Sequence, residues 1–226
     1  MIVCVAANAD KVLCITPSSP SPILTLIGND TIIQSGRHRN DRKYKYLGAT
    51  TGPDGRVYCF PCASEYVLAV DTVQMTVHQI GPNIYDTNME RLCQNKWQNG
   101  VFIPQHNCIW GIPLAAESVL KIDFNHLQMN GDPTISTWPI PAPHQNMGKW
   151  EGAVVASYNN SNNNNNEDGV VVAAYCIPNN HKASLRIEMP TTQWLQEHYS
   201  STAIECTTGT PNVNIIDGND TVAYES

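Results

Sequence analysis

Short apolar stretches separated by turn residues recur along the chain in a fixed order. Residues 96–104, 108–113 and 118–123 form one such set of three. Each stretch is short, rich in Val, Ile, Tyr and Trp, and bounded by Gly, Pro, Asn or Asp, which is typical of β-strands rather than helices. In another set, Gly52-Pro53-Asp54-Gly55 separates the first two stretches and indicates a tight hairpin.

The same order of three stretches occurs in residues 45–71 and again in residues 149–188. A partial copy opens the chain, where residues 10–17 match the middle stretch. A fourth apolar stretch follows the third one. Four short strands per repeat, at about 45 to 50 residues, are the signature of a β-propeller blade. We therefore predict an all-β chain, a β-propeller or partial propeller of about four blade-like repeats, at residues 5–28, 45–81, 96–140 and 149–188.

The C-terminal part departs from the repeat. We predict propeller repeats over residues 1–190 and a C-terminal helix and tail over residues 191–226. Residues 192–199 have apolar groups at near-helical spacing, which predicts a short helix. The tail carries Val213, Ile215, Ile216 and Val222 and is expected to supply one or two edge strands. The Asn-rich residues 159–166 fall in a predicted hairpin, and we expect a disordered loop there.

The best copy reads Lys-Trp-x-x-Gly-Val, then Ile-Trp-Gly-Ile-Pro, then Ser-Val-Leu-Lys-Ile-Asp, in residues 96–123. This motif resembles a repeat of largely uncharacterised β-propeller-like proteins of algae and other microbial eukaryotes, over roughly residues 5–188. The resemblance implies the fold and no particular activity. A more distant similarity, through residues 52–58, is to six-bladed lactonase and lyase propellers.

Three full repeats and one partial repeat are fewer than the 4 to 8 blades of most closed propellers. Two explanations stay open. Either the chain is a fragment of a larger propeller, which we favour because it begins inside a repeat, or it closes with four irregular blades that use the tail.

Composition narrows the classes of partner. Of the 226 residues, 13 are basic and 20 acidic, giving a formal charge of -7, which disfavours a nucleic-acid partner. No apolar run is long enough to span a bilayer, and residues 1–7 lack the features of a signal peptide, so we expect no membrane partner. Eight cysteines without such a signal indicate reduced thiols and a cytoplasmic location.

One edge of the repeats carries the candidate ligand-binding residues. In antiparallel strands, the start of strand one shares an edge with the end of strand two. Lysine–aromatic pairs therefore gather beside the prolines that end the middle stretches. Facing inward, they would form a cationic, aromatic mouth for an anionic or sugar-like ligand. The competing interpretation is that the aromatic rings fill space between blades and the lysines protect strand edges. The residues are Lys45, Tyr46, Lys96, Trp97, Lys149 and Trp150.

The opposite edge repeats acidic residues, namely Asp71, Asp123 and Glu188. Carboxylates are ligands for Ca²⁺, but turn hydrogen bonds are the simpler role, and we predict no metal and no cofactor. Cys59 and Cys62 form a CxxC that we interpret as ordinary buried thiols. No catalytic triad motif or His-Glu-x-x-His motif occurs, and His38 lies in a basic cluster that we interpret as a solvated loop.

These patterns favour a non-enzymatic binding or protein-interaction scaffold whose protein or small-molecule ligand is unknown. The alternative is a metal-dependent propeller hydrolase or lyase of lactonase-like type. The packing interpretation makes two stability predictions. Trp97→Ala should cost roughly 3 to 5 kcal/mol, and Lys96→Ala should be nearly neutral, within about 0.5 kcal/mol, as an exposed edge charge.

Overall fold

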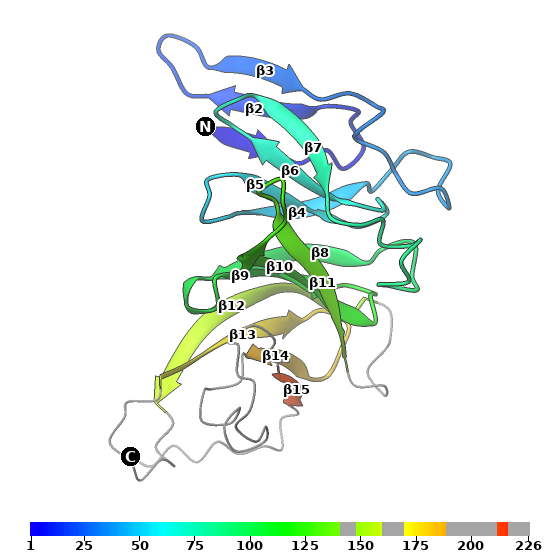
Figure 1. The fold of residues 1–226 in the computed structure, drawn as a ribbon, viewed down its shortest axis with the longest axis vertical. Helices are drawn as coiled ribbons and strands as arrows, with labels where there is room; N and C mark the ends of the chain where they lie inside the picture. Colours follow the sequence, from blue (N-terminus) through cyan, green and yellow to red (C-terminus); the bar gives the residue numbers. More distant parts are fainter. Residues whose placement is uncertain (141–147, 160–169, 189–211, 217–226) are drawn as a thin grey trace.

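The computed structural model describes residues 1–140, 148–159, 170–188 and 212–216, and these residues are all-β. Their strands form four antiparallel sheets that follow one another along the chain and along the long axis of the molecule (Figure 1). Within this part of the chain there is no α-helix, only a short 3-10 turn, η1 (Pro104–His106). The predicted all-β class with about four blade-like repeats is therefore confirmed.

The second, third and fourth sheets each have four strands paired in chain order. The second sheet consists of β4 (Tyr46–Thr51), β5 (Val57–Pro61), β6 (Val67–Asp71) and β7 (Thr76–Ile80). The third consists of β8 (Trp97–Ile103), β9 (Cys108–Pro113), β10 (Ser118–Leu127) and β11 (Pro133–Pro139). The fourth consists of β12 (Trp150–Asn159), β13 (Val170–Pro178), β14 (Ser184–Glu188) and β15 (Asn212–Ile216).

The first sheet corrects the predicted register of the first repeat. It has three strands, β1 (Ile2–Cys4), β2 (Val12–Thr16) and β3 (Ile23–Ile27). In the second sheet, the loop between the second and third strands, β5 and β6, accepts hydrogen bonds from the side chain of Lys96 in the following sheet. In the first sheet, the loop between β1 and β2 accepts them in the same way from Lys45. The β2 strand is thus a third strand, and assigning it to the middle position was wrong. Middle and third strands share one alternating apolar pattern, so sequence alone did not separate them.

The fourth sheet takes its last strand from the tail. Strand β15 pairs with β14, so the expectation that the tail supplies an edge strand is confirmed for residues 212–216. The predicted helix at 192–199 lies outside the described residues, as do residues 160–166 of the Asn-rich stretch. Within the described residues, no helix has the length and hydrophobicity that crossing a membrane requires.

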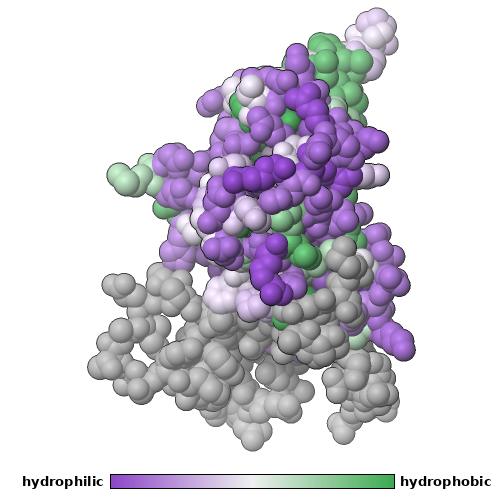
Figure 2. All heavy atoms as spheres, turned by 90° about the vertical axis from the view of Figure 1, so that its right-hand side faces the viewer, coloured by the Kyte–Doolittle hydropathy of each residue, from purple (hydrophilic) through white to green (hydrophobic). Residues whose placement is uncertain are grey.

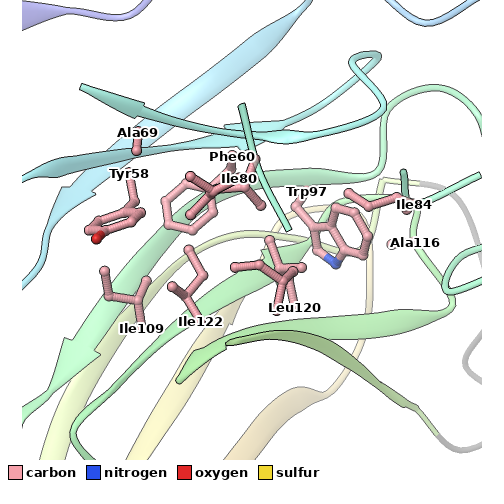
Figure 3. Close-up of a cluster of buried hydrophobic side chains, with 12 residues drawn as sticks. Tyr58, Phe60, Ala69, Ile80, Ile84, Trp97, Ile109, Ala116, Leu120 and Ile122 are labelled. Carbon is pink, nitrogen blue, oxygen red and sulfur yellow. The ribbon is translucent and has the colours of Figure 1, made fainter. Parts of the chain in front are cut away.

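Apolar side chains fill the three spaces between successive sheets. Figure 3 shows the cluster between the second and third sheets, where Phe60 and Ile80 face Trp97, Leu120 and Ile122. Similar clusters lie between the first and second sheets and between the third and fourth. The two end sheets lie at opposite ends of the molecule, so the described sheets form an open succession rather than a closed ring (Figure 1).

Strand pairing fixes what each edge of the sheets carries. The first residue of strand one lies opposite the proline that ends strand two, as in Tyr46 with Pro61 and Trp97 with Pro113. The prediction that the start of strand one and the end of strand two lie at the same edge of the sheet is therefore confirmed. We call this the lysine edge, because Lys45, Lys96 and Lys149 precede these strands. The opposite edge, with the turns that join strands one and two, is the hairpin edge.

Candidate functional site

The three lysines of the lysine edge are buried. Lys45, Lys96 and Lys149 are 1%, 2% and 0% exposed, respectively. The expectation that these lysines are exposed edge charges is therefore wrong. An uncompensated buried ammonium group is costly, so each one needs hydrogen-bond acceptors nearby.

Each ammonium group finds acceptors in the preceding sheet, in the loop that joins its second and third strands. Lys96 Nζ donates to the carbonyl oxygens of Cys62 (3.2 Å) and Ser64 (2.7 Å). Lys149 Nζ donates to the carbonyl oxygen of Ala116 (2.9 Å). Lys45 Nζ reaches the first sheet, where it binds the carbonyl oxygen of Ala9 (2.9 Å) and the Asp10 carboxylate (2.8 Å).

The lysine backbone repeats the same link. The N–H of Lys96 donates to the preceding sheet at Cys62, while its carbonyl accepts from Leu114 and Ala116 of its own sheet. Lys149 follows this pattern, with its N–H donating to Leu114 and its carbonyl accepting from Asn179. Side chain and backbone together tie one sheet to the next at a single residue.

The aromatic residue beside each lysine anchors its own sheet. Trp97 and Trp150 are fully buried, and their indole N–H groups donate to the carbonyl oxygens of Ser118 (2.8 Å) and Ala183 (2.9 Å). Tyr46 is also buried, and Ser64 Oγ donates to its hydroxyl (2.8 Å). The burial of all six lysine and aromatic side chains favours the packing interpretation over a ligand mouth. The stability cost of Trp97→Ala stays a prediction.

Burial also affects the charge of the lysines. Desolvation lowers the pKa of both Lys96 and Lys149 to about 8, although nearby Glu90 acts in the opposite direction on each. The Glu90 carboxylate is itself buried and accepts a hydrogen bond from Ser118 Oγ (2.6 Å). Burying these two ammonium groups therefore opposes folding, and the remaining interactions of the fold have to offset that cost.

The predicted acidic edge consists of carboxylates with local partners. Asp71 Oδ1 accepts from the N–H groups of Val73 and Gln74 at 2.8 Å each and so caps a turn. Burial alone would raise the pKa of Asp123, but hydrogen bonds from Lys121 Nζ and from neighbouring groups bring it well below its usual range. Glu188 pairs with Arg186. Within the described ranges, no three His, Cys, Asp or Glu side chains are arranged to hold a metal ion.

The CxxC cysteines are buried thiols that form no disulfide. Cys59 packs in the core between the first two sheets, where burial raises its pKa to about 12. Cys62 lies in the loop that receives Lys96, and desolvation raises its pKa as well. The interpretation of these residues as ordinary buried thiols is confirmed.

The basic cluster around His38 lies in an exposed loop, as expected, and its arginines also form ion pairs. The Arg37 guanidinium binds both oxygens of Glu65 at 3.1 Å and also binds Asp86 at 3.0 Å. Although burial opposes ionisation, hydrogen bonds from Asn83 and Arg37 lower the pKa of Glu65. Because Glu65 comes from the loop after β5, no local sequence pattern indicated this pairing.

Two exposed tyrosines accompany these arginines on the lysine edge. Arg37 lies over the Tyr85 ring, with its guanidinium carbon 5.6 Å from the centroid, and Arg39 lies over Tyr44 at 4.7 Å. Tyr44 and Tyr85 are 45% and 37% exposed. The two loops are joined, because Gln94 Nε2 donates to the carbonyl oxygen of His38 (3.0 Å). We call residues 37–44 and 83–94 the arginine–tyrosine surface.

A small hollow opens beside this surface. Its enclosed volume is about 0 Å³, too small for a water molecule, and His38, Glu65, Tyr85, Cys93 and Lys96 contribute to its lining. Sites for small molecules usually offer about 300 to 1,000 Å³. The hollow is thus smaller than a typical ligand pocket, whereas the neighbouring loops offer a broad exposed surface.

Comparison with known proteins identifies no family. No family model matches the chain, and no curated protein matches it. Among solved structures, a catalytically inactive virginiamycin B lyase from Staphylococcus aureus with quinupristin is similar at 15% identity and a TM-score of 0.48. An auxiliary nutrient binding protein from Bacteroides thetaiotaomicron is similar at 11% identity and a TM-score of 0.44.

These comparisons align most of this chain with part of a longer one. The lyase alignment covers 94% of this chain and 49% of that one, and the alignment with the nutrient binding protein covers 82% and 44%. The chain thus spans about half the length of the structures it resembles. At these identities the function has to be argued from the residues of this chain.

Proposed function

We propose that this protein is a non-enzymatic scaffold that binds a protein partner through the arginine–tyrosine surface. The observation that carries the proposal is the pair of Arg–Tyr stacks, each with an exposed tyrosine, on adjoining loops. Tyr and Arg are enriched among the residues that dominate protein-binding energy, because they combine a large contact area with directional hydrogen bonds. Both stacks occupy loops, where binding residues are commonly found on a rigid scaffold.

Fixed geometry supports the proposal. Arg37 is held by two carboxylates and Arg39 by Asp41, whose carboxylate accepts from its Nε at 2.7 Å. These contacts limit the rotamers of both arginines before any partner arrives, which reduces the entropy cost of binding. Residues 37–44 and 83–94 end next to Lys45 and Lys96, whose buried ammonium groups are hydrogen-bonded to the preceding sheet and so hold the ends of both loops in place. The metal-dependent alternative has less support, since Asp71, Asp123 and Glu188 all have structural partners.

The test compares matched surface variants in a capture experiment. The immobilised full chain is incubated with an extract of the source cells, and bound proteins are identified by mass spectrometry. We expect a specific partner that the Tyr44→Ala/Tyr85→Ala double variant loses. A Val73→Ala variant should keep it, because Val73 is 91% exposed in the turn after β6, away from the lysine edge. Thermal melts of both variants check that they are folded.

Two results would overturn the proposal. One is that the parent chain retains no partner above the level of a blank matrix. The other is that the double variant retains the partner as well as the Val73→Ala control does.

A further inference from the structure

The three interfaces between sheets follow one rule. Each sheet has a front face, toward the preceding sheet, and a back face, toward the following sheet. The front face carries a leucine and a β-branched residue two positions later on the third strand, and all are fully buried. These pairs are Leu68 with Val70, Leu120 with Ile122, and Leu185 with Ile187.

The first sheet has the same front face without a cover. Leu13 and Ile15 occupy the equivalent positions of β2, and cross-strand pairing places Leu26 and Leu24 beside them. Leu24 and Leu26 are 63% and 61% exposed. In the second and third sheets, the residues equivalent to Leu24 are Val77 and Ile135, which are 7% and 6% exposed.

The exposed front face extends to the remaining strand of the sheet. Ile2 of β1 pairs with Ile15 and is 57% exposed. Figure 2 shows hydrophobic residues gathered at the upper end of the molecule, where the first sheet lies. The row Ile2, Ile15 and Leu24 and the row Cys4, Leu13 and Leu26 contain no charged residue. This composition is that of a buried interface rather than of an ordinary surface.

The opposite end of the molecule presents a back face. In the second and third sheets, the residues before the proline that ends strand two are Phe60 and Ile112. Both face the following sheet and are fully buried. Ile177 takes this position in the fourth sheet and is 53% exposed. Val154 of β12 pairs with Tyr175 two positions before Ile177, so it lies on the same face, and it is 54% exposed.

We propose that copies of this chain associate head to tail, with the front face of the first sheet packing on the back face of the fourth sheet of a second copy. Every interface inside the chain joins a front face to a back face, so the second copy supplies the kind of surface that the exposed front face fits. Two copies joined in this way close a ring if the rotation between them is suitable, and otherwise they continue as an open chain.

Charged groups near this contact lie on the back face, where Arg186 and Glu188 pair with one another. Each copy has a formal charge of -7, but the two rows of the front face are free of charged groups. Repulsion between the remaining surface charges is screened at physiological ionic strength over about 8 Å. Association is therefore expected to become stronger as the salt concentration rises.

The test uses sedimentation velocity of the full chain over a wide concentration range. The front variant is Leu24→Lys/Leu26→Lys, and the back variant is Val154→Asp/Ile177→Asp. We expect the parent mass to rise with concentration and each variant alone to sediment as a monomer, its association weakened by more than about tenfold. An equimolar mixture of the two variants should form a 1:1 complex, because each retains the face that the other has lost. Val73→Lys, in an exposed turn, should associate like the parent.

Several results would overturn the proposal. A parent chain that is monomeric throughout the range is one. If the back variant still forms dimers while the front variant does not, the first sheet pairs with its own copy instead. If the mixture stays monomeric, the two faces do not bind one another. Thermal melts of each variant check that it is folded.

Discussion

At the scale of single residues, the lysine edge shows how a charged side chain becomes part of the core. Lysine is seldom fully buried, because its ammonium group loses hydration. Lys96 compensates by donating to the carbonyl oxygens of Cys62 and Ser64, which themselves need partners in the loop. The ammonium group and the carbonyl groups therefore satisfy one another, and the aliphatic stem fills the space between two sheets.

The first prediction concerns this lysine. Lys96→Ala should lower the free energy of unfolding by about 2 to 4 kcal/mol, because it leaves a cavity and removes a donor from two buried carbonyls. Urea denaturation of the parent and the variant measures the change. Lys11→Ala is the matched control, since Lys11 is exposed, and it should change stability by less than about 0.5 kcal/mol. Equal effects of the two substitutions would contradict a structural role for Lys96.

The neighbouring tryptophan gives a second prediction. Trp97→Ala should cost roughly 3 to 5 kcal/mol, because it empties a fully buried site. Trp97→Phe keeps most of the ring volume but loses the hydrogen bond to Ser118, so its cost should be roughly 1 to 3 kcal/mol. Chemical denaturation measures both. The packing role would be rejected if Trp97→Ala were as stable as the parent.

At the scale of elements, β8 of the third sheet packs closely against β5 of the second sheet. The pairing of β8 with β9 is irregular between Trp97 and Gly100. A Cβ atom on Gly100 would lie 2.2 Å from Phe60 Cζ of the second sheet and 2.6 Å from the Trp110 carbonyl oxygen. Glycine is therefore required at this position by the backbone of its own sheet and by a ring of the preceding one.

A matched pair of glycines tests this close approach. Gly100→Ala should cost about 1 to 3 kcal/mol, because the backbone or the Phe60 ring has to move. Gly152→Ala in β12 should be tolerated, since an added Cβ atom there meets no atom within 4 Å. Thermal denaturation distinguishes the variants. If both alanines have the same effect, the steric argument at Gly100 is wrong.

The η1 turn supplies a pH-dependent contribution to stability. Trp110 Nε1 donates to His106 Nδ1 at 3.3 Å, which requires a neutral imidazole. Burial, together with nearby Lys121, lowers the pKa of His106 to about 4, although a backbone hydrogen bond with Val172 acts in the opposite direction. An unfolded histidine takes up a proton near pH 6.5, so between about pH 6.5 and 4 the unfolded state binds more protons. This contribution is complete above pH 6.5 and is lost as the pH falls toward 4.

The corresponding experiment measures the free energy of unfolding at several pH values in that window. His106→Gln keeps a polar side chain that does not titrate, so its stability should fall less steeply than that of the parent. The difference in slope should approach about 1.4 kcal/mol per pH unit at most, which corresponds to one proton. Parallel profiles for the two proteins would show that His106 titrates normally in the folded state.

Much of the strand pattern was predictable, because alternating apolar stretches and turn residues are local features. The second and third repeats have the predicted strands, and the shared edge of Tyr46 with Pro61 followed from hairpin geometry. The first repeat was misassigned, because Ile2–Cys4 is a very short strand and its neighbours are set by tertiary packing.

The lysine edge was predictable in position but not in burial. The recurrence of lysine before three strands was visible in the sequence, yet an isolated lysine is expected at the surface. Its acceptors lie about 30 residues away, as for Lys96 and Ser64, and they are backbone carbonyls that every residue type possesses. No residue pattern marks such an acceptor, so the structure was needed to identify it.

At the scale of the whole molecule, the sheets are linked in series. Besides the lysine ties, Arg56 of the second sheet binds Asp132 in the turn before β11 at 2.6 Å. The second and third sheets are each covered on both faces, whereas the first sheet has an exposed front face. Stability in such arrays depends on the interfaces with neighbours, so an end sheet such as the first, with a single covered face, should open before the inner second sheet.

Hydrogen exchange followed by mass spectrometry tests this order. Strands β3 and β7 are the matched comparison, because both are last strands, one in the first sheet and one in the second. In dilute protein, the amides of β3 should exchange faster than those of β7, since Leu24 and Leu26 are exposed while Val77 is buried. If copies associate through the front face, raising the protein concentration should slow exchange in β3 and leave β7 unchanged. Equal protection of the two strands in dilute protein would mean that the first sheet unfolds only together with the second, as one cooperative unit.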